Sequence, residues 1–201
     1  DMNEPLASAA GNGLEVRNAV DFLTGAHQDA RLREVTLALC AEAARMAGKA
    51  ATSDAALALV TDALDSGRAA EHFGRMVAAL GGPVDFIADM DRHLAPAPII
   101  RDVFATGQGA IVDVDTRGVG MAVVALGGGR TMPADSIDHR VGFDRLAGLS
   151  AIVEAQTPIA RLHAADEASA ADAEARLKSA YRLGDTPPSH PLIAAQIPPT
   201  E

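Results

Sequence analysis

Apolar residues recur at helical spacing through the first 95 residues of the chain. The clearest series is spaced by three, four, four and three residues and consists of Leu32, Val35, Leu39, Ala43 and Met46. This spacing places the five side chains on one face of an amphipathic helix, which we expect to end at Gly48. Similar patterns predict further helices over residues 14–23, 54–66, 69–80 and 84–94.

The pattern changes at residues 95–98, where Pro96 and Pro98 disfavour a continuing helix. The residues that follow predict two strands joined by a turn, a helix ended by three glycines, several short strands and a last helix. Their ranges are 99–105 and 110–114 for the strands, 118–126 for the first helix, 137–162 for the short strands and 166–183 for the last helix. The fold class is therefore predicted to be α+β, with a helical part over residues 1–95 and a small mixed part over residues 96–201.

Composition and charge narrow the classes of partner. The chain has 201 residues, 48% of them apolar and 22% charged, and its formal net charge is −10. Without a block of basic residues, neither nucleic acid nor an anionic membrane surface is expected as a partner. No apolar run approaches the roughly 20 residues that span a bilayer. Cys40, the single cysteine, excludes an internal disulfide, and we expect it to be a buried, inert thiol in a cytoplasmic protein.

The residues alone yield no catalytic set. The six histidines lack the spacing of a helical zinc pair, and His163 stands out only because Asp166 and Glu167 follow it. The turn over residues 127–130, Gly-Gly-Gly-Arg, offers amides and a guanidinium to an anion. Glycines also commonly end helices, and this second interpretation is favoured.

Residues 148–163 resemble the hairpin of a biotinyl or lipoyl carrier domain. Such a carrier needs a lysine at an exposed turn as its attachment point. The chain has only Lys49 and Lys178, and both lie in predicted helices elsewhere. A working carrier is therefore disfavoured.

Several segments, in order along nearly the whole chain, resemble the thymidine and pyrimidine-nucleoside phosphorylases, and most closely the bacterial thymidine phosphorylases. The first reads Asp-Met-Asn-Glu-Pro-Leu-Ala-Ser-Ala-Ala-Gly-Asn-Gly-Leu-Glu-Val, and a later one reads Asp-Thr-Arg-Gly-Val-Gly-Met-Ala-Val-Val-Ala-Leu-Gly-Gly-Gly-Arg. The similar segments are residues 1–16, 19–25, 67–77, 115–130, 135–138, 141–143 and 158–164. The resemblance implies that the chain corresponds to the C-terminal half of such an enzyme, and its opening at Asp1 reads as the continuation of a longer protein.

The resemblance carries an expected fold. The family has a small helical domain and a large α/β domain, with the active site in the cleft between them. Residues 1–95 would then be the later helices of the large domain. Residues 96–201 would be the small C-terminal domain, whose barrel-sandwich core accounts for the carrier-like segment.

The resemblance also implies a reaction, the reversible phosphorolysis of thymidine to thymine and 2-deoxyribose 1-phosphate in pyrimidine salvage. Cations and hydrogen-bond donors are needed at the phosphate and at the departing base. In the family they come from a Lys-His-Ser-Thr-Gly-Gly loop and from Arg, Ser and Lys groups in motifs that this sequence does not contain. No catalytic residue is therefore assigned to this chain, which is expected to be inactive alone. Phosphate is expected as co-substrate without another required cofactor, and the parent enzyme as a homodimer.

The resemblance also implies part of a metal site. Some family members bind a cation, often potassium, through two main-chain carbonyls and a glutamate, and the matching positions here are Leu6, Ala9 and Asn18. Asn18 keeps an oxygen ligand but lacks the negative charge, which lowers affinity for a hard cation. For Leu6 and Ala9, ordinary loop packing is an equally open interpretation.

A second function, of a different class, stays open beside the enzyme. The same scaffold could act as a free-standing, non-catalytic binding or interaction module. Such a module would have to cover the surface that the rest of the enzyme normally buries, and it predicts self-association or a protein partner.

Overall fold

The computed structural model describes residues 1–186 and 189–197, which fall into two compact units. Residues 17–94 form one, here called the helical unit, and residues 1–16 together with 95–201 form the other, here called the mixed unit. Within the described residues, no helix is long and apolar enough to cross a membrane. Helices combined with antiparallel sheets make the fold α+β, as predicted from the sequence.

The helical unit contains most of α1, which begins in the mixed unit, and four further helices. These are α1 (Asn12–Thr24), α2 (Ala30–Met46), α3 (Ser53–Asp65), α4 (Arg68–Ala79) and α5 (Met90–His93). Side-chain caps fix two of the helix starts. Asp29 accepts a hydrogen bond from the Leu32 amide at the start of α2, and Thr52 does the same for the Ala55 amide at the start of α3.

The predicted helix over residues 84–94 is wrong in its first part, since only its last turn forms α5. Residues 84–89 form turns instead, in which the Phe86 amide donates to the Pro83 carbonyl. The Asp85 side chain is engaged 2.9 Å from Nε2 of His93. This segment therefore folds back onto α5 rather than extending it.

The helix predicted over residues 32–46 forms as α2, but no residue of α2 is buried. Leu39 is 63% exposed and Met46 is 82% exposed, and Cys40, expected to be a buried thiol, is exposed as well. The α2 helix packs against α3. Arg33 of α2 also forms a bidentate ion pair with Asp65 of α3. Periodicity identifies an apolar face correctly, but it does not say whether anything in the chain covers that face.

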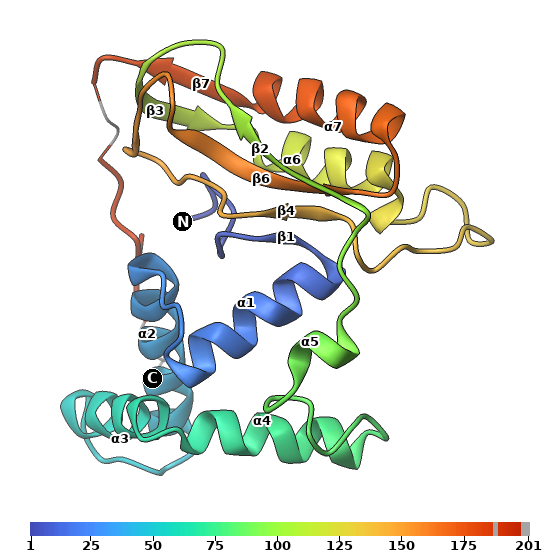
Figure 1. Ribbon diagram of the computed structural model, residues 1–201. Coiled ribbons are helices and arrows are strands. Elements are labelled where there is room, and N and C mark those ends of the chain that lie inside the picture. Colours follow the sequence, from blue (N-terminus) through green and yellow to red (C-terminus); the bar gives the residue numbers. More distant parts are fainter. Residues whose placement is uncertain (187–188, 198–201) are drawn as a thin grey trace. The chain divides into compact units, whose positions relative to one another are not determined.

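The mixed unit holds two antiparallel sheets and two helices (Figure 1). One sheet has the order β1-β4-β6-β2 and the other the order β5-β3-β7. The strands are β1 (Ala10–Gly11), β2 (Ile99–Phe104), β3 (Gly109–Val114), β4 (Gly142–Asp144), β5 (Ile152–Val153), β6 (Pro158–Ala164) and β7 (Tyr181–Gly184). The helices are α6 (Thr116–Val123), which continues as the π-helical turn η1 (Val124–Gly128), and α7 (Glu167–Ala180).

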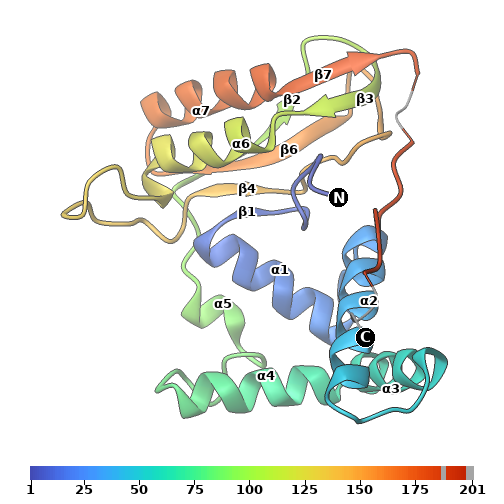
Figure 2. The ribbon, with the colours of Figure 1, turned by 180° about the vertical axis from the view of Figure 1, so that it is seen from behind.

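Helices α6 and α7 lie on the same side of the four-stranded sheet, as Figure 2 shows from behind. The core between these layers includes Phe143 of β4, Leu162 of β6 and Leu177 of α7, each fully buried. Three alanines of α7 are buried beside Leu177, at positions 170, 173 and 180. Small side chains on this face let the helix lie close to its neighbours.

Two predicted elements of the mixed unit differ in detail. The strands β2 and β3 follow each other along the chain but belong to different sheets, since β2 pairs with β6 and β3 pairs with β5 and β7. The last helix was predicted to reach residue 183, yet it ends at Ala180, and Tyr181 begins β7 opposite Val114. A hydrogen bond from the Tyr181 hydroxyl to the Ala147 carbonyl, 3.0 Å long, holds this strand in the core.

Residues 1–16 pack with the mixed unit, whereas the sequence divided the chain into 1–95 and 96–201. Strand β1 pairs with β4, and the Glu4 carboxylate accepts a 2.6 Å hydrogen bond from the Leu149 amide. These contacts explain the difference, because they join segments that are far apart in the sequence. The assignment of 1–95 and 96–201 to two domains of a larger enzyme stays a prediction.

Candidate functional site

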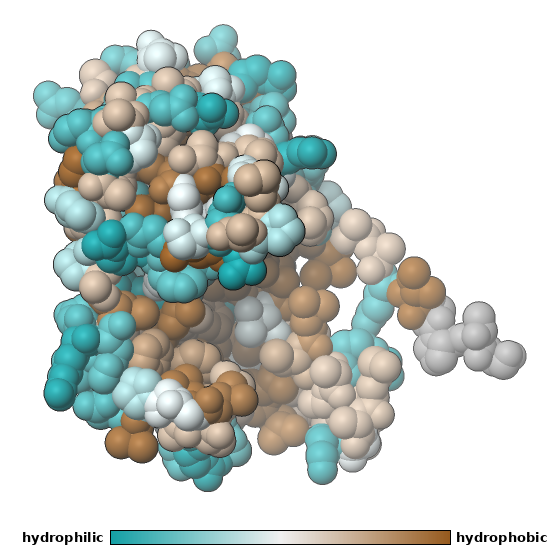
Figure 3. All heavy atoms as spheres, turned by 90° about the vertical axis from the view of Figure 1, so that its right-hand side faces the viewer, coloured by the Kyte–Doolittle hydropathy of each residue, from teal (hydrophilic) through white to brown (hydrophobic). Residues whose placement is uncertain are grey.

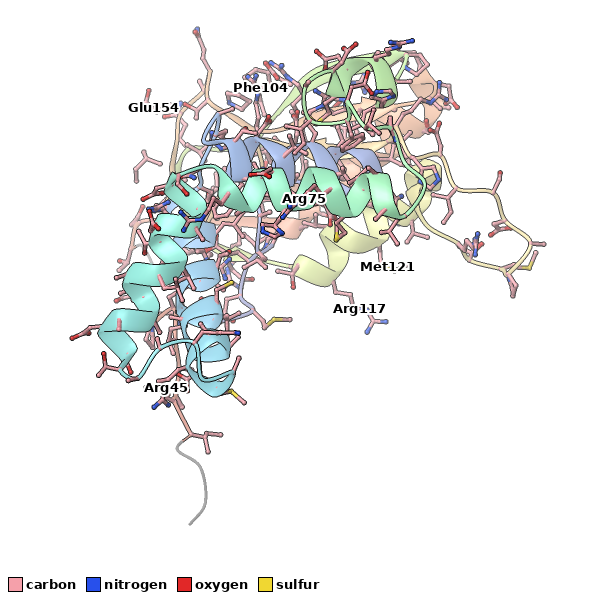
Figure 4. All side chains as sticks on the ribbon, turned by 90° about the horizontal axis from the view of Figure 1, so that it is seen from below. Arg45, Arg75, Phe104, Arg117, Met121 and Glu154 are labelled. Atoms are coloured by element: carbon pink, nitrogen blue, oxygen red, sulfur yellow. The ribbon has the colours of Figure 1, made fainter. Side chains whose placement is uncertain are left out.

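The glycine-rich segment that follows α6 is the first candidate, and its structure begins at the start of that helix. The Asp115 side chain caps α6 by accepting a 2.8 Å hydrogen bond from the Gly118 amide. A Cβ at Gly118 would lie only 2.6 Å from Oδ2 of Asp115, so the cap itself calls for glycine at this position. Arg117 of α6 projects away from the ribbon (Figure 4), and Met121 is 49% exposed.

The turn at residues 127–130 ends this helical segment through carbonyl contacts. Gly127 has a φ of 89°, in the left-handed region that glycine adopts most readily at helix ends. Its carbonyl accepts a 2.9 Å hydrogen bond from the Asp138 amide, and the Gly128 carbonyl accepts a 2.7 Å bond from Nδ2 of Asn12. The left-handed Gly127 supports the interpretation as a helix end, and the two bonds attach this end to residues 12 and 138.

Between the glycine turn and β4, the loop of residues 129–140 is held by its own carboxylates. Oδ2 of Asp135 accepts three hydrogen bonds, from the amide and hydroxyl of Thr131 and from the Met132 amide, and these bonds lower the pKa of Asp135. Asp138 forms a bidentate pair with Arg140, which lowers the pKa of Asp138. The loop is thus ordered by internal contacts and by its attachment to the glycine turn.

The second candidate is a polar group of side chains on the four-stranded sheet. Side chains alternate along a strand, so Arg161 and His163 of β6 point to the same face. Asp102 of β2 and Asp144 of β4 both lie opposite Arg161 in the strand register. Nε of Arg161 donates to Oδ1 of Asp102 over 2.9 Å, and this bond is the main cause of the lowered pKa of Asp102.

His163 is the buried member of this group, with 7% of its surface exposed. Its Nε2 lies 3.3 Å from Oδ2 of Asp144, without the geometry of a hydrogen bond. Oδ1 of Asp144 is likewise buried and has no hydrogen bond among the described residues. An imidazole this deeply buried offers little surface to a substrate. His163 and Asp144 therefore lie side by side on neighbouring strands, with little of the imidazole exposed.

The predicted cation ligands fall in different parts of the structure. Leu6 and Ala9 belong to the mixed unit, where Leu6 is 52% exposed and Ala9 is buried, and Asn18 belongs to the helical unit on α1. Two carbonyls and an amide are neutral oxygen donors, which fit a weakly held monovalent cation better than a divalent one. Carboxylates near them in sequence are engaged, Glu4 with Leu149 and Glu15 with the Gly11 amide. The set of Leu6, Ala9 and Asn18 stays a prediction.

No group of three or more His, Cys, Asp or Glu side chains that could hold a metal occurs in residues 1–186 and 189–197. The carrier alternative also lacks support. The segment 148–163 forms β5, a turn closed by the Thr157 amide on the Glu154 carbonyl, and most of β6. Lys178 lies on α7, bonded to Glu174 over 2.7 Å, and Lys49 follows α2, so neither is placed on that turn.

Sequence reasoning missed the polar group on the sheet and the tethers to residues 1–16. The alternation of residues within 99–104 and 158–164 was a signal that Asp102, Arg161 and His163 each occupy a defined face. Strand pairing was still needed to bring them together. No comparable signal connects Asn12 to Gly128, because 116 positions separate the two residues.

Both candidates belong to an α+β domain. Their polar side chains mainly hold its strands and turns together. Residues 110–184, from β3 to the end of β7, match the family model of the pyrimidine nucleoside phosphorylase C-terminal domain. This match supports the pyrimidine nucleoside phosphorylases as the family to which the residues from β3 to β7 are related. Over these residues the resemblance seen in the sequence is confirmed, and the members of that family are pentosyltransferases that act on nucleosides.

Proposed function

We propose that this chain is the C-terminal part of a thymidine phosphorylase, which interconverts thymidine and phosphate with thymine and 2-deoxyribose 1-phosphate. The observation that carries the proposal is the family match over residues 110–184. The similar segments outside that range, among them residues 1–16 and 67–77, occur in the order of the family and support the longer assignment.

The chemistry fixes what the enzyme has to provide. A phosphate oxygen forms a bond to the anomeric carbon of the sugar while the bond from that carbon to the base nitrogen breaks. The electron pair leaves with thymine, which then takes up a proton. Positive charge builds on the sugar ring and negative charge on the base, so catalysis depends on donors placed at the phosphate and the pyrimidine.

Those donors are proposed to lie outside these 201 residues. The sequence contains no Lys-His-Ser-Thr-Gly-Gly loop, and two arginines of the mixed unit, Arg161 and Arg140, are paired with Asp102 and Asp138. The chain would then serve as a scaffold for a site completed by the rest of a homodimeric parent enzyme. Its isolated form is expected to be inactive.

The test begins with the DNA upstream of the Asp1 codon and continues with an assay. An in-frame extension that encodes the phosphate loop, and a product that releases thymine from thymidine only when phosphate is present, would support the proposal. The 201-residue chain assayed alone is the matched control and should release no thymine. An intact parent protein without phosphate-dependent thymine release would overturn the proposed reaction, and turnover by the isolated chain would overturn its assignment as an inactive part.

Thymidine as the preferred substrate is tested separately. The ratio of kcat/KM for thymidine, deoxyuridine and uridine, measured on the active parent protein, ranks the three nucleosides. A higher value for uridine than for thymidine would keep the phosphorylase assignment and replace the substrate.

A non-catalytic binding module is the second candidate, and one observation favours it. The helical unit exposes large apolar side chains, among them Leu39, Met46, Leu80 and Val84. Figure 3 views the protein from the right-hand side of Figure 1. It shows hydrophobic atoms at the surface in the lower part of that view, where the turn after α4 lies. Concentration-dependent association of the chain in sedimentation experiments would support this candidate. A monomer that binds no hydrophobic dye would argue against it.

A further inference from the structure

We draw no further inference here: the strongest candidate, the apolar face of α2 that carries Val35, Leu39 and Met46, supports no proposal because nothing in the structure shows what covers it.

Discussion

Replacing Asn12 by alanine tests whether residues 1–16 are fastened to the glycine turn. Nδ2 of Asn12 donates to the Gly128 carbonyl over 2.7 Å, and Gly128 is buried. The substitution removes the donor and leaves a buried carbonyl without this partner. Such a loss costs about 1–3 kcal/mol, more than the net value of an ordinary hydrogen bond. We expect the free energy of unfolding of the mixed unit to fall by that amount.

The chain offers a selective probe for this measurement. It contains one tyrosine and no tryptophan, so its intrinsic fluorescence reports Tyr181 in the mixed unit. Denaturant titration followed by tyrosine fluorescence therefore measures the unfolding of this unit, while far-ultraviolet circular dichroism also follows the helical unit. The loss should be larger in the fluorescence transition. An equal shift of both transitions would mean that the two units unfold together.

Two further variants separate the tether from other effects. Asn3→Ala is the matched control, because Asn3 is exposed and the hydrogen bond found there uses its backbone amide. Asn12→Asp keeps the size of the side chain, but a carboxylate cannot donate to the Gly128 carbonyl. We expect it to destabilise at least as much as Asn12→Ala. If the aspartate variant were as stable as the wild type, or if Asn12→Ala matched Asn3→Ala, the tether would be refuted.

Three other predictions follow from the same unit and from the predicted cation site. Gly128→Ala places a Cβ 2.7 Å from Cγ1 of Val123 and should lower Tm. Gly120→Ala is the control, because Gly120 is helical and has open space around it; it should leave the free energy of unfolding unchanged or raise it by the helix propensity of alanine, about 1 kcal/mol. Because the pKa of Asp102 is lowered in the folded state, its pair with Arg161 stabilises the protein above the ordinary value of 3.8 and loses this contribution as the pH falls below it. Acid unfolding curves of Asp102→Asn should therefore depend less on pH in that range, and the effect should be small because the pair is partly exposed. If Leu6, Ala9 and Asn18 hold a potassium ion in the parent protein, KCl should raise its Tm more than an equal concentration of tetramethylammonium chloride does. Asn18→Glu should enlarge this difference, and an equal difference in the variant and the wild type would contradict the site.

The helices of the first 95 residues were largely predictable from local pattern. The predicted ranges 14–23, 69–80 and 32–46 agree closely with α1, α4 and α2. Local pattern does not predict burial, because burial depends on which other segment packs against the helix. The stripe through Leu39 and Met46 has helical spacing and is nevertheless exposed. A hydrophobic face is a property of the segment, whereas burial is a property of whatever packs on it.

The strands illustrate the same limit. The predicted strands over residues 99–105 and 110–114 agree closely with β2 and β3, but no local signal assigns them to different sheets. The segment after Ala180 continues an alanine-rich helical pattern, and pairing of Tyr181 with Val114 on β3 overrides it. Residues 10–11 are too short to be recognised as a strand at all, and they pair with β4 across more than 130 positions of sequence. Non-local pairing therefore decided each element that the sequence left undetermined.

The contacts of the polar groups in the mixed unit bear on where the chemistry of the proposed enzyme lies. A catalytic donor has to be free to reach a reacting atom, and several polar groups of the mixed unit are instead engaged in contacts that hold the fold together. Asp115 caps α6, the Gly127 and Gly128 carbonyls receive Asp138 and Asn12, and other charged side chains pair across strands. These groups hold neighbouring segments of the domain in place. This is why the family match and the lack of a phosphate loop in the sequence support one proposal, in which the chain supplies the scaffold and the phosphate and base contacts come from elsewhere in the enzyme.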